Sequence, residues 1–466
     1  MEMEMDFKSL RKDIQKTGSK NSNLGKGIMS YDDALEFVRN LMSEKLQKEM
    51  DEAGKDKKDE AIIKDKKYLR KKKQEFKKKI EDIVYGNNMH VRGYEQNIEL
   101  FIANMVEELA GYSILADAYK NPSVSDIFCL EWDKIYVEKN GVNEKYHKTF
   151  RNPEHYKIFV DRLVRDSGKE INNGAKKIVN FELYGDRYTA TSKAVSPKDF
   201  SLTVRKHKEE QLQLENIIAY NVMSQEIADF LGTLILGECN IIYGGLTGSG
   251  KTTSIRALLD FYVSQANKRM LVCEDTQELF PKNDHTLELV STQNDDSRLE
   301  VTLQELIYTA LRLKPKYICV GEVRGVEAES AVEAMETGHS TIFTMHGGKP
   351  INIVNRLVTK YLSAMPSLGI DVVERIIGSA VDYIVLQDDI PGIGKKVTSI
   401  TEISFDFERG RVELKPIYEY DFIKEDFIKV NKISQDKAKT MLRRGVKIDT
   451  LKSMVEGWDT DVLKTA

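Results

Sequence analysis

The sequence predicts an α/β protein in which a smaller α+β domain precedes a larger domain built on a parallel sheet. Short apolar runs alternate with helical segments over residues 216–420, as expected for parallel strands joined by crossover helices. Short strands and a few helices are mixed over residues 89–210, which is typical of an α+β domain. Lysine and acidic residues dominate the stretch from Ser43 to Asp82. Residues 1–88 are therefore predicted to form a charged, largely helical or partly disordered arm.

The composition favours a multidomain protein of the cytoplasm. The 466 residues are 41% hydrophobic and 31% charged with a net charge of -4, which gives no overall bias toward nucleic acid. The four cysteines lie in or beside apolar segments without CxxC spacing, so we expect reduced, mostly buried thiols. The acidic N-terminus does not resemble a signal peptide, and no apolar run is long enough to span a bilayer. We therefore expect any membrane association to be peripheral or through partners.

Individual elements follow from the spacing of apolar residues. The window Ile227–Tyr243 is broken by polar residues and is predicted to be a buried helix followed by a strand. Residues 421–466 are predicted to form a helical C-terminal extension of short amphipathic helices. The predicted helices and strands of the N-terminal domain are Ile98–Ala110, Ile135–Val137, His155–Arg165, Ile178–Phe181, Tyr188–Ala190 and Leu202–Val204.

The lysine-rich arm leaves three interpretations open. Lys71–Lys73 and Lys77–Lys79 are closely spaced, and such a charge run most often forms the solvated face of a helix. Docking on anionic lipid or on an acidic partner is the second interpretation. Binding of nucleic acid is the third.

A glycine-rich motif joins a predicted strand to a predicted helix. The segment Gly245–Thr252 has the pattern GxxxxGK[ST], follows the strand Asn240–Tyr243 and opens the helix Thr252–Tyr262. In such a loop Lys251 reaches the β- and γ-phosphates of a nucleotide and the Thr252 hydroxyl ligates Mg²⁺. The predicted nucleotide-binding residues are Gly245, Thr247, Gly248, Ser249, Gly250, Lys251, Thr252 and Thr253. The loop alone does not distinguish an ATPase from a kinase or a GTPase.

Two later apolar runs end in charged side chains, where the carboxyl ends of parallel strands gather ligands. Glu274 and Asp275 follow Met270–Cys273 and are candidates for holding Mg²⁺ or orienting water. Capping of the next turn is the alternative. Glu322 and Arg324 follow Tyr317–Val320, where the carboxylate would activate water and the guanidinium would neutralise phosphate charge. A plain ion pair is the alternative.

Two histidines flank a third apolar run. His339 comes before Thr341–Met345 and His346 comes directly after it. Both are candidates to hydrogen-bond the γ-phosphate or to signal its presence to a neighbouring subunit. Because their spacing does not place them on one helix face, metal ligation is disfavoured. A packed histidine with satisfied hydrogen bonds is the alternative for either.

These motifs together resemble those of a known family. GGLTGSGKTT, CEDTQEL, ALRLKPKYICVGEVRG and AMETGHSTIFTMH are similar to the motifs of CpaF/TadA-type ATPases. That group belongs to the type II/type IV secretion superfamily, which includes the PilT and GspE proteins. The resemblance extends upstream to SDIFCLEWDKIYVEKNG and DFSLTVRKH and covers about residues 98–420.

The resemblance implies both a fold and an activity. It implies a RecA-like P-loop domain at residues 216–420, Mg²⁺-dependent hydrolysis of ATP, and a ring of six copies of the chain. The N-terminal domain would close over the nucleotide, with Arg187 and Arg205 as candidate phosphate ligands; an ordinary surface ion pair is the alternative for each arginine. One departure is Lys316, which stands where the family has an aspartate, and we expect that loss to be tolerated.

The resemblance also implies a biological setting. The motor would power type II/type IV secretion, Tad-like pilus assembly or conjugative transfer from the cytoplasmic face of the membrane. Its partners would be inner-membrane platform proteins, and direct binding of nucleic acid is not expected. Two other functions on the same core stay open. One is a nucleic-acid translocase or helicase, and the other is a scaffold that binds ATP but scarcely hydrolyses it.

Overall fold

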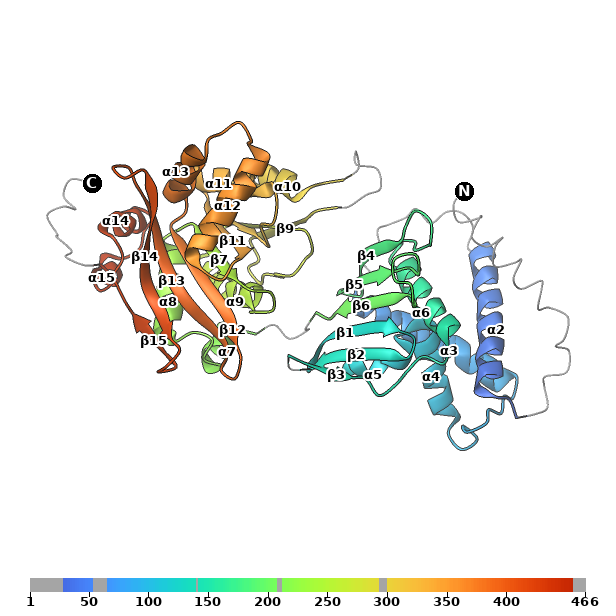
Figure 1. The fold of residues 1–466 in the computed structure, drawn as a ribbon. Helices are drawn as coiled ribbons and strands as arrows, with labels where there is room; N and C mark the ends of the chain where they lie inside the picture. Colours follow the sequence, from blue (N-terminus) through green and yellow to red (C-terminus); the bar gives the residue numbers. More distant parts are fainter. Residues whose placement is uncertain (1–27, 53–64, 140, 208–211, 293–299, 456–466) are drawn as a thin grey trace. The chain divides into compact units, whose positions relative to one another are not determined.

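The computed structural model describes residues 28–52, 65–139, 141–207, 212–292 and 300–455, and of residues 46–52 the backbone only. The chain divides into two compact units, Met1–Glu209 and Glu210–Ala466, and each is described by itself (Figure 1). The boundary lies in the polar connector that separates the two sets of elements. Among the described residues no helix is both long enough and apolar enough to cross a membrane.

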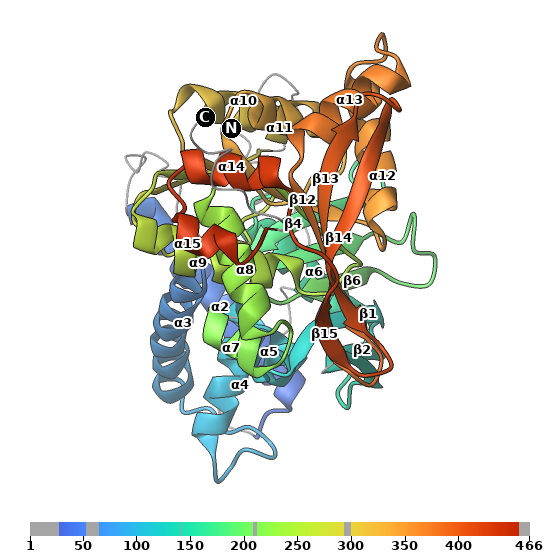
Figure 2. The same ribbon diagram turned by 90° about the vertical axis from the view of Figure 1, so that its left-hand side faces the viewer.

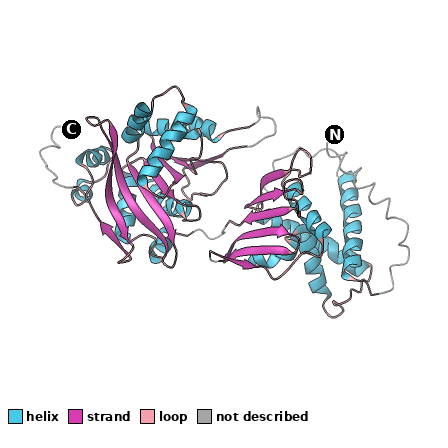
Figure 3. Ribbon diagram, viewed as in Figure 1, coloured by secondary structure: helices cyan, strands magenta, loops and turns pink. Residues whose placement is uncertain are grey.

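The first unit is built on a six-stranded antiparallel sheet with the order β3-β2-β1-β6-β5-β4 (Figure 3). Side chains alternate between its two faces, and the inward set packs with the helices into one core. The strands are β1 Val124–Glu131, β2 Lys134–Lys139, β3 Val142–Lys145, β4 Ile178–Leu183, β5 Asp186–Thr191 and β6 Ser201–Arg205. The helices are α2 Tyr31–Glu52, α3 Lys66–Gly86, α4 Ile98–Ala110, α5 Ala116–Lys120 and α6 Pro153–Asp166, with a 3₁₀ turn at Ser113–Leu115. The helices and strands predicted for this region are confirmed.

Helix α3 shows how the lysine-rich arm folds. Asp65 caps its start by accepting a hydrogen bond from the Tyr68 N–H at 2.7 Å. Ile80 and Val84 are buried in a core that α3 shares with α2 and α4, whereas Lys71 and Lys78 are exposed. The interpretation of a solvated helix therefore holds for the lysine-bearing face only. Residues 1–27 and 53–64 of the arm lie outside the described part of the chain.

The second unit is built on a nine-stranded mixed sheet with the order β15-β14-β13-β12-β7-β11-β10-β8-β9. Strands β12 to β9 in this order are parallel, as the sequence predicts. Strands β13, β14 and β15 continue the sheet as an antiparallel meander. The strands are β7 Ile241–Gly245, β8 Met270–Glu274, β9 Thr286–Val290, β10 Tyr317–Val320, β11 Ser340–His346, β12 Tyr383–Ile390, β13 Gly394–Asp406, β14 Arg411–Asp421 and β15 Asp426–Lys429.

Helices cover both faces of this sheet, so the inner parallel strands are buried on both sides, whereas the edge strand β9 is largely exposed. One core contains α7 Leu214–Ala219, α8 Gln225–Leu236, α9 Lys251–Ala266, α14 Gln435–Arg443 and α15 Ile448–Lys452. The other contains α10 Leu303–Arg312, α11 Glu327–Glu336, α12 Pro350–Ala364 and α13 Ile370–Ala380. Figure 2 shows α14 and α15 beside α8. The stretch 421–466 thus contains β15 as well as two short helices.

A buried carboxylate ties α14 to the sheet. Glu238 lies 2.8 Å from both Lys268 and Lys316, and its backbone carbonyl accepts a hydrogen bond from Arg444. Lys316, which stands where the family has an aspartate, is therefore paired with an acid in this chain. Met441 of α14 packs over Gly237, where a Cβ would lie 2.5 Å from the Met441 Cγ. The helix and this glycine fit each other closely.

All four cysteines are free thiols and buried, which confirms the prediction from their apolar surroundings. Cys129 lies in β1 of the first unit, and Cys239, Cys273 and Cys319 lie in the second. Burial raises the pKa of each thiol, that of Cys273 to about 12. Each is therefore protonated at neutral pH and chemically inert while the fold is intact.

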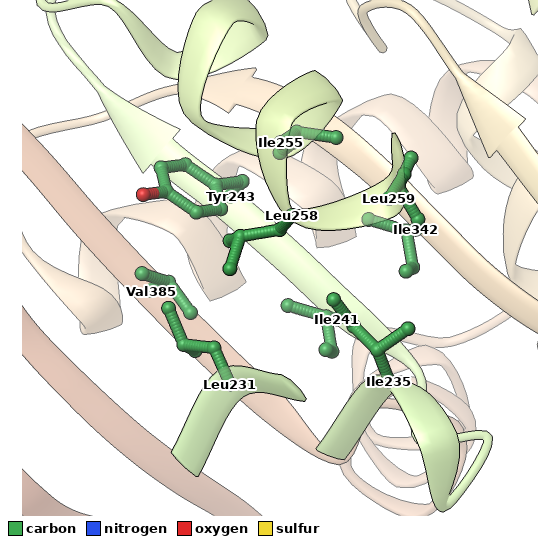
Figure 4. A pocket seen from close by; sticks show the side chains of 9 residues that line it. All are labelled: Leu231, Ile235, Ile241, Tyr243, Ile255, Leu258, Leu259, Ile342 and Val385. Carbon is green, nitrogen blue, oxygen red and sulfur yellow. The ribbon is translucent and has the colours of Figure 1, made fainter. Parts of the chain in front are cut away.

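A small cavity of about 10 Å³ lies in the core beneath α9. Figure 4 shows that its lining side chains come from α8, α9 and the strands β7, β11 and β12. They are Leu231, Ile235, Ile241, Tyr243, Ile255, Leu258, Leu259, Ile342 and Val385. An apolar void of this size offers a water molecule no hydrogen-bond partners, so it stays dry.

Candidate nucleotide-binding site

Four neighbouring parallel strands end at one edge of the nine-stranded sheet and carry most of the predicted site residues. Strand β7 leads into the glycine-rich loop, and β11 ends in His346, which pairs in register with Gly245. Strand β10 leads to Glu322, and β8 ends in Glu274. This is the edge at which parallel α/β sheets bind ligands.

The loop after β7 is shaped by glycines. Gly248 and Gly250 have φ of 81° and 90°, the left-handed region that disfavours other residues. Gly245 passes so close to β12 that a Cβ would lie 2.0 Å from the Gln387 carbonyl oxygen. Helix α9 starts directly after the loop, and no side chain among the described residues caps its N-terminus. Its first N–H groups therefore face the loop, as in a phosphate-binding site.

Lys251 is buried, with its ammonium group turned back onto the loop. Its Nζ donates hydrogen bonds to the carbonyl oxygens of Gly245 at 3.0 Å and Leu246 at 2.9 Å. Burial lowers the pKa of Lys251 because the charged form loses hydration. Thr252 and Thr253 follow it in the first turn of α9, half-buried. These residues surround a place where a phosphate group would be held by N–H groups and one cation.

Glu322 lies between two cationic or protonatable side chains. Its Oε1 is 2.7 Å from His346 Nε2, and its Oε2 accepts a hydrogen bond from Arg324. The other histidine nitrogen, Nδ1, lies 3.4 Å from Lys251 Nζ and 3.3 Å from the Gly245 carbonyl oxygen. Lys251, His346, Glu322 and Arg324 thus form one continuous chain of polar contacts. The sequence predicted the members of this chain but not their order.

Glu274 and Asp275 lie at the end of β8. Glu274 is buried and accepts hydrogen bonds from the backbone N–H groups of Glu278 and Leu279 at 3.1 and 3.2 Å, so it caps the following turn. Burial raises the pKa of Glu274 to about 8. Asp275 is exposed and accepts a hydrogen bond from Ser291 Oγ at 2.9 Å.

His339 is not brought to this edge. It precedes β11, whose first residue Ser340 pairs with Tyr317 at the start of β10. His346 ends the same strand. Because the strand has seven residues, His339 and His346 lie roughly 20 Å apart. The His339 Nδ1 lies 3.1 Å from Thr337 Oγ1, and burial lowers the pKa of His339. Within its unit, His339 is therefore a packed histidine at the opposite end of the sheet.

Arg187 and Arg205 belong to the first unit, where the structure places them side by side. They are direct partners in the antiparallel pair β5–β6, on the face opposite Tyr188 and Val204, which are buried. Arg187 Nε lies 3.9 Å from Glu182, and Arg205 Nε lies 3.3 Å from Asp126 Oδ1. Two cations directly opposite each other repel, and an anion bound between them would relieve that repulsion.

Two further residues shape the site, and sequence reasoning missed them. Gln387 of β12 donates from Nε2 to the Ser249 carbonyl at 2.6 Å and accepts from the Tyr243 hydroxyl at 2.8 Å. Thr344 of β11 donates to the Gly321 carbonyl at 2.5 Å and so fixes the turn that carries Glu322. The sequence signal that could have identified both residues is a polar side chain inside an otherwise apolar strand.

The residues present fit a nucleotide with Mg²⁺. Among the described residues, the buried Ser249 Oγ in the loop has no hydrogen-bond partner, and Lys251 donates to two carbonyls that a phosphate could replace. No cluster of three or more metal-binding side chains occurs in the described ranges. Mg²⁺ in phosphate sites takes few protein ligands and many from phosphate and water, so Thr252 with one or two carboxylates is a suitable set.

The strand, glycine loop and helix with its buried lysine define a P-loop nucleotide-binding domain. The predicted fold class is confirmed: an α/β P-loop domain of the RecA-like kind follows a smaller α+β domain and helices of an N-terminal arm. Residues 191–400 match the family model described as Type II/IV secretion system protein. This match confirms the resemblance to the type II/type IV secretion superfamily that was inferred from the motifs.

Several curated proteins are similar to the same region. An uncharacterised protein of Methanocaldococcus jannaschii is 32% identical over 222 residues, which are 46% of this chain and 40% of that protein. The conjugal transfer protein TrbB of Rhizobium radiobacter is 29% identical over 205 residues, 44% of this chain and 60% of TrbB. VirB11 of Agrobacterium fabrum is 28% identical over 163 residues, 34% of this chain and 47% of VirB11. The chain thus spans 40% of the first of these relatives and 31% of a second M. jannaschii protein.

Among solved structures, the chain is similar to the pilus retraction motor PilT with bound ADP. The identity is 17%, the TM-score is 0.44, and the match covers 73% of this chain and 89% of PilT.

Proposed function

We propose that the protein is an ATPase that hydrolyses ATP with Mg²⁺ to drive a type II/type IV secretion, pilus-assembly or conjugative machine. One observation carries the proposal. His346 connects the P-loop lysine, at 3.4 Å, to Glu322, at 2.7 Å, so that a carboxylate capable of activating water lies beside the phosphate-binding loop. Two findings support this function. Residues 191–400 match the family model described as Type II/IV secretion system protein, and a similar protein, TrbB, is named as a conjugal transfer protein.

The geometry gives each residue a role. On binding ATP, Lys251 would exchange the carbonyls of Gly245 and Leu246 for phosphate oxygens, which are better partners for a buried cation. Thr252, with Glu274 and Asp275, is proposed to hold Mg²⁺, which when bound supplies positive charge against the phosphates.

Glu322 is proposed as the group that accepts a proton from the attacking water. Arg324 donates a hydrogen bond to one carboxylate oxygen and His346 Nε2 lies 2.7 Å from the other, so both side chains restrict the orientation of Glu322. Arg324 would also neutralise charge that develops on the γ-phosphate. His339 stays a candidate for signalling to a neighbouring subunit, since it lies away from this edge.

We further propose Arg187 and Arg205 as ligands of an anionic group, because their juxtaposition favours a bound anion. We propose the domain limits 1–88, 89–210, 216–420 and 421–466, a ring of six copies, and inner-membrane platform proteins as partners. The protein would act at the cytoplasmic face of the membrane. Release of phosphate would then drive movement of the domains, and that movement would be passed to the partners.

The test is steady-state hydrolysis of ATP by the full chain and three variants. Glu322→Gln should lower kcat by roughly 10²–10⁴ while still binding ATP, and Lys251→Ala should lose nucleotide binding. Glu408→Gln, an exposed glutamate between β13 and β14, is the matched control and should behave as the wild type. Anionic vesicles and DNA are added in separate assays.

The outcomes separate the competing functions. Turnover that disappears in Glu322→Gln, together with nucleotide-dependent hexamers in solution, supports the motor. Turnover stimulated by DNA alone would indicate a translocase. ATP binding without turnover in the wild type would indicate a scaffold and contradict the proposal.

A further inference from the structure

Gln387 lies beside the P-loop, on a strand that none of the nucleotide-binding motifs includes. It belongs to β12, next to β7 in the sheet, and only 1% of it is exposed. The other side chains of β12 that face the core, such as Tyr383 and Val385, pack in the apolar cluster beneath α9. A buried amide is costly unless its donors and acceptor are used, and here the P-loop uses them.

The two hydrogen bonds of Gln387 fix the direction of its amide. The Tyr243 hydroxyl donates to Oε1 at 2.8 Å, so Nε2 is left to donate to the Ser249 carbonyl at 2.6 Å. Burial raises the pKa of Tyr243 well above its usual value, so the hydroxyl keeps its proton at neutral pH. The Ser249 carbonyl can only accept, so a turned amide would place Oε1 against that carbonyl and lose this hydrogen bond.

Gln387 also contacts the other end of the loop. The backbone carbonyl oxygen of Gln387 lies 2.0 Å from the position that a Cβ on Gly245 would take. Its side-chain Nε2 lies 3.0 Å from the position that a Cβ on Gly250 would take. The beginning and the end of the P-loop therefore both pack on this one residue. The Gly245 carbonyl is also one of the two that accept a hydrogen bond from Lys251 Nζ. A shift of Gln387 would displace the backbone that binds phosphate and the lysine together.

We propose that Gln387 is a positioning residue that keeps the P-loop in its nucleotide-binding conformation. The inference rests on the proposed function in one respect, that the loop binds nucleotide. Without the amide, the Ser249 carbonyl and the Tyr243 hydroxyl lose a buried partner and the loop occupies other conformations. The apparent Kd rises in inverse proportion to the fraction of molecules with a competent loop. The chemical step, which depends on Glu322, is unchanged once nucleotide is bound.

The experiment measures the Kd of MgADP by calorimetry, and the kcat and KM for ATP, on the full chain. Gln387→Met keeps the side-chain volume and removes both hydrogen bonds. It should raise Kd and KM about tenfold, the factor that corresponds to about 1.4 kcal/mol, with kcat within about twofold. Tyr243→Phe, which frees the amide to rotate, should raise Kd about threefold. Because both changes act through one amide, the double variant should resemble Gln387→Met alone.

Tyr383→Phe is the matched control. Tyr383 is also fully buried, begins the same strand β12, and donates its hydroxyl to Glu402 at 3.2 Å, at the end of the strand away from the P-loop. This variant should lower stability slightly and leave Kd unchanged. An equal rise of Kd in Tyr383→Phe and Tyr243→Phe would mean general loosening of the core and would overturn the inference.

The remaining outcomes separate the inference from the proposed function. If the wild type does not bind MgADP, the proposed function fails. If the wild type binds MgADP and Gln387→Met and Tyr243→Phe bind it equally well, only the role of Gln387 fails. Should Gln387→Met not fold, Tyr243→Phe and its control still decide, since a phenylalanine fits the same space.

Discussion

Glu274 illustrates how burial changes the chemistry of one residue. Its pKa is raised from 4.5 to about 8 because the charged form is poorly hydrated at the end of β8. In the unfolded chain the same carboxyl group ionises at its usual value, near 4.3. Between these two values the folded state holds a proton that the unfolded state has released. Stability therefore falls as the pH rises through this window, and the cost is complete above about pH 8.

Glu274→Gln should remove this pH dependence. The glutamine is neutral at every pH, and its carbonyl oxygen can still accept from the N–H groups of Glu278 and Leu279. Each pKa unit corresponds to about 1.4 kcal/mol of unfolding free energy. The difference in unfolding free energy between the variant and the wild type should therefore be larger at pH 8 than at pH 5, by on the order of a few kcal/mol, in favour of the variant. Urea unfolding of the second unit at several pH values in EDTA measures the gain. Parallel pH profiles for the wild type and Glu274→Gln would contradict the raised pKa, and Glu408→Gln again serves as control.

At this scale the sequence predicts the residues of the P-loop and of the strand ends, because their roles follow from local motifs. It does not predict Gln387, whose partner Ser249 lies 138 residues away, or Thr344, whose partner Gly321 lies 23 residues away. By contrast, the separation of His339 from His346 follows from the sequence, since the two residues flank one apolar run that forms a strand. Contacts between distant segments depend on strand order, and a single sequence does not reveal that order.

Helix α9 connects the P-loop to the core, and the small cavity beneath it makes this packing testable. Leu258→Ala would enlarge the cavity and remove apolar contacts, so the free energy of unfolding of the second unit should fall by about 2–5 kcal/mol. Gln265→Ala, an exposed position on the same helix, should change it by less than about 0.5 kcal/mol. Urea unfolding followed by circular dichroism measures both, and a loss below about 1 kcal/mol in Leu258→Ala would show that the site collapses around the deletion.

The elements themselves were partly predictable. Helices α4 and α9 and the parallel strands follow from apolar periodicity and from the glycine motif. The antiparallel meander β13–β15 was not predicted, because a strand has the same pattern whether its neighbour runs parallel or antiparallel. Helix α3 was predicted from its lysines as a solvated helix, whereas its apolar residues 80, 83 and 84 bury a face against α2 and α4. The lysines indicated the exposed face of α3, but they gave no indication of its buried face.

At the scale of the whole molecule, the two units have separate cores. The sequence predicts a division where mixed elements give way to alternating strands and helices, and the structure divides the chain between Glu209 and Glu210. Separate cores imply that the units can lose their structure at different denaturant concentrations, so a single unfolding midpoint need not describe the chain.

The distribution of the buried thiols gives each unit its own chemical reporter. A brief pulse of a maleimide reagent should modify none of the four cysteines in the native protein. As urea increases, Cys129 should become reactive with the opening of the first unit, and Cys239, Cys273 and Cys319 should become reactive together with the second. Peptide mass spectrometry resolves the two groups. A thiol that reacts before its unit unfolds would reveal local opening at that strand. ATP should then protect the three thiols of the second unit, because a ligand stabilises the unit that binds it. Protection of Cys129 as well is the result expected if Arg187 and Arg205 of the first unit also contact the nucleotide.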